Sequence, residues 1–395
     1  MKIDVFCEVE KAGITTAGEH QLLKETLAQA QFADACGFDC WWEVEHHTAV
    51  EMSYSSAPEV ILSAIAQRTR RMRIGHAAVL APHNFSHPLR IAERAATLDL
   101  LSDGRLEMGF ARSTIPEWRL FQIPPEVTRD QQEQTMRMVP KMWTEEHFSW
   151  ESPEFCIRNA PVIPKPYQKP HPPMWQAATS AASFEMAGQL GVGVLGVTLL
   201  TPVDAMAGML ASYREAVKTA DPVGSFVNNQ TGVFTFVHCA ETTRQAIENG
   251  AAEAAAWYIN TITKFFELEE MMRQMEASMS EGADVAGAGR LGLAEAGSAT
   301  AVATAAPPTS GPLALVARLA HGEEISGEEA YEVLANEGGV IIGDVETCIR
   351  KMKDYEAIGT DRLLCFQQVG GLSHESILDS MQLIGEHIIP KFSPK

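Results

Sequence analysis

The sequence predicts a (β/α)8 TIM barrel formed by a single domain over residues 1–395. Three observations support this fold class. Short apolar segments alternate with amphipathic ones, eight such pairs follow one another, and polar residues cluster where the apolar segments end. Strands that alternate with helices form parallel sheets through right-handed crossovers. The chain length lies near the upper size range of a barrel with eight units.

Eight short apolar segments are the predicted barrel strands. They cover residues 3–8, 38–44, 72–80, 105–110, 174–177, 192–197, 232–238 and 362–367. The predicted helices cover residues 18–36, 57–70, 88–101, 126–144, 181–190, 204–220, 242–279 and 373–388. We expect Gly37 to end the first helix, and Pro58 and Pro88 to lie in the first turns of the next two.

Three segments depart from this alternation. Residues 148–151 and 155–158 are predicted to pair as a hairpin, and residues 161–173, with six prolines, to be extended and irregular. Residues 280–312 consist mainly of Gly, Ala, Ser and Thr, so they can bury little apolar surface. We interpret them as a flexible insertion between strands seven and eight, either a surface loop or a lid over the site.

The charge and composition exclude several classes of protein. The formal net charge is −20, and no basic cluster beyond residues 68–71 favours nucleic-acid binding. No apolar run approaches the roughly 20 residues that cross a bilayer, and the N-terminus enters a strand without a signal-peptide segment. Seven scattered cysteines with no Cys-x-x-Cys pair predict free thiols in a reducing compartment, and hence a cytoplasmic protein.

Polar and small residues follow four of the predicted strands. In parallel α/β proteins, ligands bind at the carboxyl ends of the strands. An imidazole can exchange a proton near neutral pH, an arginine can hold an anion, and hydroxyls at a helix start bind phosphate. Simple N-capping explains Thr179 and Ser180 equally well. Together the strand ends indicate a pocket for a planar cofactor that carries a phosphate; its residues are Glu45, His46, His47, Ala77, Ala78, Arg112, Thr179, Ser180 and Ser183.

A metal site is the alternative use of the histidines. Barrel hydrolases often bind zinc at strand ends, and this chain has His46-His47 and also His83 and His87. Adjacent histidines on an extended strand point to opposite faces, so they rarely bind one ion together. His83 and His87 precede a proline and are expected on a loop. We therefore predict no metal site, and a metal hydrolase is the less favoured hypothesis.

Several longer motifs resemble a known family. They are Glu45-His46-His47, the segments 73–82, 87–93 and 98–109, Pro164-Lys165-Pro166 with residues 171–175, and residues 366–371. On these motifs the chain resembles the bacterial luciferase-like flavin-dependent monooxygenases along nearly its whole length, except for residues 280–312. Three positions depart from the pattern: Ala111 and Ser113 flank Arg112 where many relatives have glycine, and His76 replaces a small hydroxyl residue.

The resemblance implies a (β/α)8 barrel, a homodimer, that takes reduced FMN from a separate NAD(P)H:flavin reductase. The flavin would react with O2 to a 4a-hydroperoxide that oxygenates a small organic substrate. His46 would be the base or hydrogen-bond partner near the reactive flavin atoms, with His47 as its neighbour and Glu45 beside the cofactor. The resemblance implies a cis peptide at Ala77-Ala78 against the ring. It implies that Arg112 contacts the flavin or its phosphate and that Thr179, Ser180 and Ser183 bind the phosphate.

Two further hypotheses share this barrel: a deazaflavin-dependent oxidoreductase, and a flavin-binding relative without activity. The substrate itself is not predicted. Seven apolar residues are expected either to line the substrate pocket or to belong to the core; they are Trp118, Phe121, Trp257, Phe265, Phe266, Met271 and Met272.

Overall fold

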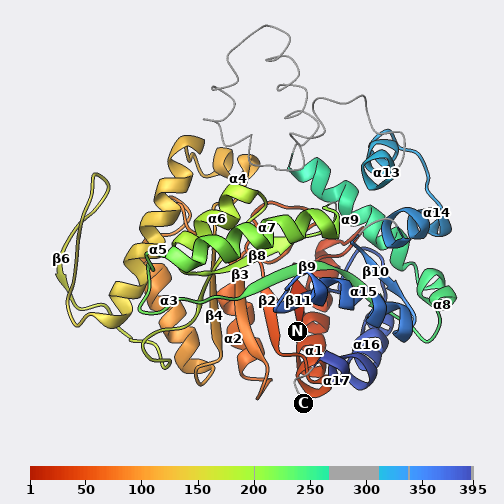
Figure 1. Ribbon diagram of the computed structural model, residues 1–395, viewed down its shortest axis with the longest axis horizontal. Helices are drawn as coiled ribbons and strands as arrows, with labels where there is room; N and C mark the ends of the chain where they lie inside the picture. The colour runs from red at the N-terminus through yellow and green to blue at the C-terminus, as the bar shows by residue number, and fades with distance from the viewer. Residues whose placement is uncertain (200, 267–310, 337–338, 393–395) are drawn as a thin grey trace, which may run out of the picture.

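The computed structural model describes residues 1–199, 201–266, 311–336 and 339–392 (Figure 1). Eight parallel strands form a closed barrel, because β11 pairs with β1 and β8 pairs with β9. The predicted (β/α)8 fold is therefore confirmed, and each predicted strand matches an observed one. In order around the barrel, the strands are β1 (Lys2–Cys7), β2 (Cys40–Glu43), β3 (Arg73–Leu80), β4 (Leu106–Ala111), β7 (Met174–Ala177), β8 (Gly193–Val197), β9 (Thr231–Cys239) and β11 (Arg362–Phe366).

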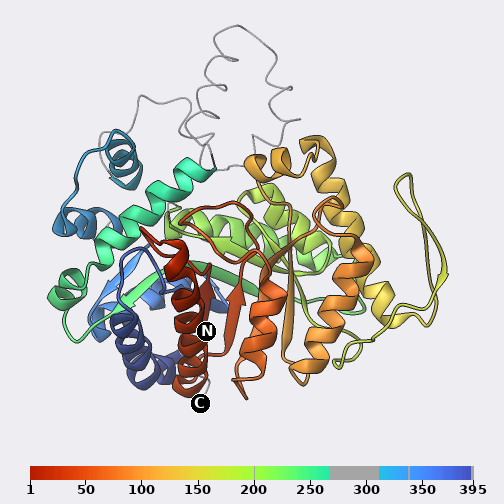
Figure 2. The ribbon, with the colours of Figure 1, turned by 180° about the vertical axis from the view of Figure 1, so that it is seen from behind.

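Helices surround the barrel (Figures 1 and 2). Gly37 ends the first helix with a left-handed φ of 91°, and its N–H donates to the carbonyl of Ala33. Pro58 and Pro88 are the first residues of their helices, as predicted. The helices between the strands include α1 (Thr16–Cys36), α2 (Pro58–Ala66), α3 (Pro88–Leu101), α5 (Thr128–Thr144), α6 (Ala181–Gln189), α7 (Val203–Ala216), α15 (Val345–Ala357) and α16 (His374–Leu383).

The prediction of one continuous helix over residues 242–279 is wrong for residues 242–266, which the structure describes. The chain forms α8 (Thr243–Glu248) and α9 (Ala251–Phe265) instead, and Gly250 between them has a φ of 82°. This left-handed conformation interrupts helical geometry and is one that glycine adopts without strain. Residues 267–279 lie outside the described residues.

Several short elements were not predicted. One follows β4, one follows α16, and the others lie in the stretch before the last barrel strand, as does the longer helix α15, which was not predicted either. The short elements are α4 (Ile115–Leu120), α13 (Gly311–Ala320), α14 (Gly327–Tyr331), a π-helical segment (Glu332–Asn336), β10 (Ile341–Gly343) and α17 (Ile389–Phe392). β10 pairs with the end of β9 and extends the sheet beyond the barrel.

The two remaining predictions concern irregular segments. A hairpin of β5 (Phe148–Glu151) and β6 (Cys156–Ala160) is present, and it projects from one side of the molecule (Figure 1). Residues 161–173 contain neither helix nor strand, as the prolines indicated. Of the predicted insertion 280–312, residues 280–310 lie outside the described residues, and the last two begin α13.

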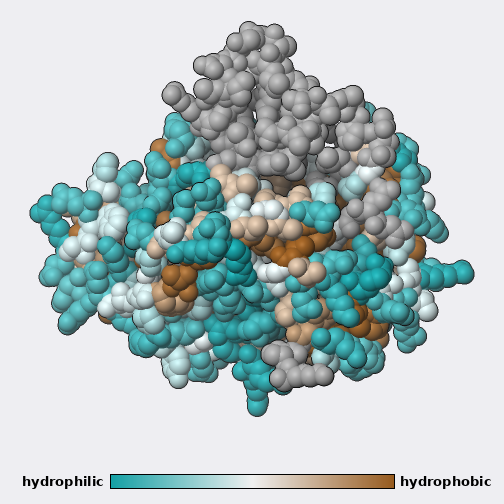
Figure 3. All heavy atoms as spheres, viewed as in Figure 1, coloured by the Kyte–Doolittle hydropathy of each residue, from teal (hydrophilic) through white to brown (hydrophobic). Residues whose placement is uncertain are grey.

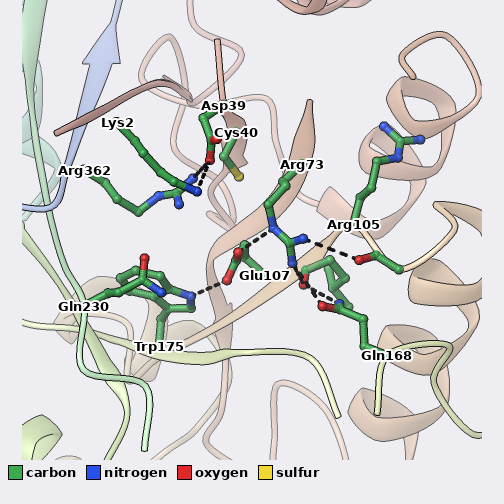
Figure 4. A network of polar contacts seen from close by, with 12 residues as sticks. Lys2, Asp39, Cys40, Arg73, Arg105, Glu107, Gln168, Trp175, Gln230 and Arg362 are labelled. Atoms are coloured by element: carbon green, nitrogen blue, oxygen red, sulfur yellow. Dashed lines mark hydrogen bonds and ion pairs between the residues drawn. The ribbon is translucent and has the colours of Figure 1, made fainter. Parts of the chain in front are cut away.

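A buried ionic network joins the strands at the amino-terminal end of the barrel (Figure 4). The Arg362 guanidinium on β11 donates to Asp4 on β1 at 2.7 Å and also to Asp39, just before β2. Trp42 donates to the same Asp4 carboxylate at 2.8 Å. Arg362 is 1% exposed and Asp4 is fully buried. Charges that are buried together must be paired, so this network specifies how the first and last strands meet.

A second group of contacts continues the network to β3, β4 and β7. Glu107 accepts hydrogen bonds from Arg73 at 2.5 Å and from the Trp175 indole at 2.7 Å. Arg73 also donates to Gln168 at 3.1 Å. Polar side chains therefore bind the strands together at this end, which leaves the carboxyl ends available for a ligand site.

One face of the molecule is mostly polar. In the view of Figure 3, hydrophilic residues cover most of the face and apolar residues form small separate areas. Within the described ranges, no helix combines the length and apolar character needed to span a membrane.

Candidate active site

A cavity of about 310 Å³ opens at the carboxyl ends of the barrel strands. Its wall comes from the barrel strands and the loops that follow them, and from α5 and α9. Two of the predicted site residues, His47 and Ser180, do not line it. The seven that do are Glu45, His46, Ala77, Ala78, Arg112, Thr179 and Ser183.

The His46 imidazole is oriented by a carboxylate that the sequence analysis missed. Glu117 on α4 is 1% exposed, and its two oxygens lie 3.3 and 3.4 Å from His46 Nδ1. The same carboxylate accepts the backbone N–H of His47 at 2.7 Å and the hydroxyl of Ser113. These contacts hold Nδ1 toward Glu117 and leave Nε2 as the nitrogen that can exchange a proton with a bound molecule.

The charges of this pair are mutually stabilising. Burial lowers the pKa of His46, but the hydrogen bond and negative charge of Glu117 outweigh burial, so that the pKa lies above its ordinary value. Burial raises the pKa of Glu117, but its contacts with His46, Ser113 and the His47 N–H outweigh burial and leave the pKa lowered. The imidazolium therefore persists to higher pH than that of an isolated histidine.

Aromatic rings lie beside His46. The rings of Phe265 and Phe266, at the end of α9, have centroids 5.8 and 6.2 Å from the imidazole. Phe266 lines the cavity, so one of the seven predicted apolar residues belongs to the site. Met271 and Met272 lie outside the described residues.

His47 points to a different environment. Its Nε2 lies 3.4 Å from a carboxylate oxygen of Glu45. Its ring centroid lies 4.9 Å from that of Phe121 and 6.2 Å from that of Phe85. Glu45 also accepts the backbone N–H of Leu80 at 2.8 Å. The two adjacent imidazoles thus diverge, as expected for neighbours on extended backbone.

Two alanines form a small-residue wall on β3. The peptide bond between Ala77 and Ala78 is cis, as the resemblance implied, and the pairing register with β4 shifts between His76 and Val79. Methyl side chains let a flat ring approach the backbone closely. His76 does not line the cavity. It is buried on the other face of the strand, where burial lowers its pKa to about 4 despite the charge of Glu59 on α2.

Two arginines in the cavity wall are suited to an anion. Arg112 lies after β4 with its guanidinium 5.8 Å from the Trp118 ring, and Arg129 lies on α5. Burial lowers the pKa of Arg129, and the charge of Arg112 lowers it further. A bound anion would relieve the repulsion between these two cations.

The start of α6 completes this anion site, but its hydroxyls have a structural task as well. Ser180 accepts the N–H of Ser183 at 3.3 Å, and Ser183 accepts the N–H of Ser180 at 3.0 Å, which is a capping box. The capping explanation therefore holds for Ser180. Thr179 is exposed and lines the cavity, as does Ser183.

The residues present fit a flavin nucleotide. The two arginines and the amino terminus of α6 suit its phosphate. Between them and the alanine wall, Gln176 donates to the Ser183 carbonyl at 3.3 Å, while its buried Oε1 has no partner among the described residues. An unpartnered buried amide oxygen in a cavity wall indicates a ligand that donates to it.

Ser113 explains one departure from the family pattern. Its φ is 71°, a conformation that favours glycine, which is the residue that many relatives have there. In this chain the Ser113 hydroxyl donates to Glu117. The strain at this position thus accompanies an additional hydrogen bond to the carboxylate that orients His46.

No group of three or more His, Cys, Asp or Glu side chains suited to a metal ion occurs in the described part of the chain. The seven cysteines all lie in that part and are free thiols.

Comparison with known proteins identifies the class. The sequence profile described as "Luciferase-like monooxygenase" matches residues 1–362. The chain therefore belongs to the luciferase-like monooxygenases, a family of flavin-dependent oxidoreductases, and the predicted family is confirmed.

Two relatives illustrate the range of similarity. The oxygenase component of a flavin-dependent trigonelline monooxygenase from Acinetobacter baylyi is 24% identical over 402 residues, which cover 100% of this chain and 96% of that protein. An uncharacterized protein of Sinorhizobium fredii is 31% identical over 191 residues. That match spans about half of both proteins, 48% of this chain and 54% of the relative.

Solved structures confirm the fold. Over the whole of both chains, monooxygenase RslO1 from Streptomyces bottropensis gives a TM-score of 0.72 at 24% identity. The oxygenating constituent of 3,6-diketocamphane monooxygenase from Pseudomonas putida, solved with FMN, gives 0.69 at 16% identity, covering 100% of this chain and 99% of that one. A coenzyme F420-dependent tetrahydromethanopterin reductase from Methanopyrus kandleri gives 0.66 at 16% identity and full coverage of both. The fold is thus shared by FMN and deazaflavin enzymes.

Proposed function

We propose that this chain is the oxygenase component of a two-component monooxygenase that uses reduced FMN and O2 to oxygenate a small organic substrate. A separate NAD(P)H:flavin reductase would supply the reduced flavin. The carrying observation is one cavity whose wall contains both a cationic cluster, Arg112 and Arg129 with the start of α6, and His46 with its carboxylate partner Glu117 behind it. The full-length similarity to a protein named as an oxygenase component supports the two-component arrangement.

FMN is favoured over a deazaflavin as the cofactor. FMN ends in one phosphate, which matches the cluster formed by Arg112, Arg129 and the start of α6. Bound reduced FMN would supply the oxygen chemistry at its 4a carbon. The chain would bind the phosphate through Arg112, Thr179 and Ser183, and would place the ring against Ala77 and Ala78.

His46 is proposed to handle the proton of the reaction. Its pKa lies above the ordinary value, so the protonated ring persists to higher pH than in an isolated histidine, and Nε2 can donate a proton to a developing oxyanion or take it back. Glu117 would act as a positioning residue. Glu45, which lines the cavity, would lie beside the cofactor, and His47 would support Glu45 from outside the cavity wall. A dry cavity would protect the reduced cofactor from side reactions.

Oxygen consumption tests this function. With enzymatically reduced FMN and a panel of ketones, aldehydes and amines, we expect consumption that depends on both flavin and substrate. His46→Ala should abolish turnover and leave FMN affinity within about twofold. His47→Ala should have the smaller effect, because that ring lies outside the cavity wall. Turnover with a reduced deazaflavin alone would instead establish the alternative cofactor, and unchanged turnover in His46→Ala would reject the role of His46.

Two further expectations remain predictions, namely a homodimer and a cytoplasmic location. The outer helices α2 and α3 carry exposed apolar residues, with Val60 at 64%, Leu101 at 48% and Leu100 at 40% exposure. These side chains support dimerisation through the early barrel helices. Sedimentation velocity of the wild type and Val60→Glu would test the dimer.

A further inference from the structure

The cavity wall contains a carboxylate that the proposed chemistry does not use. Glu8 follows β1, is 3% exposed and lines the cavity. The wall near the barrel axis is otherwise apolar there, since Phe6 and Phe234 stack at 4.1 Å between ring centroids. Glu8 Oε2 has no hydrogen-bond partner in the described part of the chain.

A tyrosine fixes the orientation of this carboxylate. The hydroxyl of Tyr258 on α9 donates to Glu8 Oε1 at 2.9 Å, and Tyr258 is itself 3% exposed and packed edge-on against Phe366 at 4.8 Å. One oxygen is therefore held by the protein while the other is left for a ligand. A recognition group held in one orientation by a supporting residue is the arrangement expected of a binding site.

The unpartnered oxygen is costly unless a ligand uses it. A buried polar atom without a partner destabilises a protein by roughly 1–3 kcal/mol. Burial raises the pKa of Glu8 to about 7, although the positive charge of His46 and the hydrogen bond from Tyr258 act in the opposite direction. Both the neutral and the ionised carboxyl are thus accessible near neutral pH, and a bound donor or cation would favour the ionised form.

The position of Glu8 assigns it to the organic substrate rather than to the cofactor phosphate. In the barrel order, β1 lies across from β7, which precedes α6 and the anion site. Glu8 follows β1, whereas Arg112 follows β4, and Thr179 and Ser183 follow β7. A phosphate and a carboxylate repel each other, so the molecule that meets Glu8 is the other occupant of the cavity.

We propose that Glu8 is a specificity-determining residue, whose Oε2 accepts a hydrogen bond from an O–H or N–H group of the substrate. This inference rests on the proposed function. The substrate class is a ring compound with a hydroxyl or protonated amine group. The ring would pack on the aromatic wall, and the donor group would reach Glu8.

A matched series of small probes tests this role. Protein loaded with oxidised FMN is titrated by calorimetry with benzyl alcohol, benzylamine and benzaldehyde, which share a ring and differ in the donor. The wild type should bind the two donors at least tenfold more tightly than the aldehyde. Stronger binding of the amine than of the alcohol would assign the donor as a cation.

The substitution Glu8→Gln replaces Oε2 by an N–H donor and keeps the shape. It should weaken binding of benzyl alcohol and benzylamine at least tenfold, and should strengthen binding of benzaldehyde. Tyr258→Phe removes the hydroxyl that holds Oε1 and should reduce the same preference by a smaller factor. FMN affinity should stay unchanged in both variants, which also verifies that they fold.

Equal affinity of the wild type for the aldehyde and the alcohol would overturn the proposal, as would unchanged selectivity in Glu8→Gln. Either result with FMN still bound leaves the proposed function intact. Failure of the wild type to bind reduced FMN without oxygen, by contrast, would reject the proposed function itself.

Discussion

Glu117 connects three features of the site that are distant in the sequence. It pairs with the His46 ring, accepts the His47 N–H and accepts the Ser113 hydroxyl. Because the carboxylate is buried, these contacts are stronger than they would be in water. The orientation and the charge of His46 thus depend on one side chain from α4.

Replacing Glu117 by Gln should therefore change both the pKa of His46 and the rate. The carboxylate raises the pKa of His46, so its removal should move the imidazole titration to lower pH. We expect kcat to fall roughly tenfold to a hundredfold, as for the loss of a residue that orients a functional side chain, and by less than the loss of the proton donor itself. Titration of His46 by NMR and oxygen consumption measure the two effects. Glu126→Gln, at an exposed carboxylate, is the control. An unshifted His46 titration would contradict the pairing.

Glu8 should make stability depend on pH in a defined direction. Its pKa is about 7 in the folded protein, against an ordinary value of 4.5. Between these values the unfolded chain loses the proton and the folded protein keeps it, so stability falls as pH rises. From pH 5 to 8, the free energy of unfolding should decrease by roughly 2–3 kcal/mol more in the wild type than in Glu8→Gln. Urea unfolding at several pH values measures this free energy for both proteins. The same pH dependence in the wild type and in Glu8→Gln would contradict the prediction.

Helix breaks and loops decide where the site residues lie. α9 carries Tyr258 and Phe266 to the cavity only because the chain turns at Gly250, which has a left-handed φ and no atoms within 4 Å of an added Cβ. A side chain there would meet no clash, so the conformation alone would resist substitution. The predicted continuous helix ignored this turn, since glycine within an apolar helical pattern is often tolerated.

The pair Gly250→Ala and Gly208→Ala isolates this conformational effect. Gly208 lies within α7, exposed, and also has open space around an added Cβ. Alanine at position 250 should destabilise the protein by about 1 kcal/mol, because φ is positive there. At position 208 it should stabilise by roughly 0.5–1 kcal/mol through helix propensity. Denaturant unfolding measures both. Equal effects at the two positions would refute the explanation.

The two ends of the barrel contain different kinds of buried polar groups. The amino-terminal end contains paired buried charges that join the strands, and the carboxyl-terminal end contains groups with unsatisfied oxygens. Barrel closure requires β11 to meet β1, and Arg362 and Asp4 form the ion pair at that seam.

Arg362→Met should test the contribution of the seam. It leaves the Asp4 carboxylate buried without its partner, which should lower the free energy of unfolding by roughly 3–5 kcal/mol. Arg244→Met removes an arginine from an exposed ion pair with Glu248 on α8, and should leave the melting temperature unchanged. Differential scanning calorimetry of both variants makes the comparison. Similar melting temperatures for Arg362→Met and the wild type would show that the seam does not need this pair.

The sequence by itself determined the eight strands, most of the helices and the family, because hydrophobic periodicity and Gly and Pro signals are local properties. It also located the cavity edge at His46, Ala77 and Arg112, since carboxyl ends of parallel strands meet at one end of a barrel. Between residues 311 and 357, β10 and α14 were missed because three and five residues are too few to show a periodicity. The 13-residue helix α15 was missed although its buried residues Cys348, Met352 and Tyr355 recur at helical spacing.

Only the tertiary structure decided which side chains act together. Glu117 meets His46 across 71 positions of sequence, and Tyr258 meets Glu8 across 250. No local pattern encodes such pairs, because they form only when the barrel closes and its helices dock. The same closure separated His47 from the cavity and left one oxygen of Glu8 without a partner. The sequence therefore determined the barrel, and tertiary packing determined which side chains meet in the cavity at the carboxyl ends of its strands.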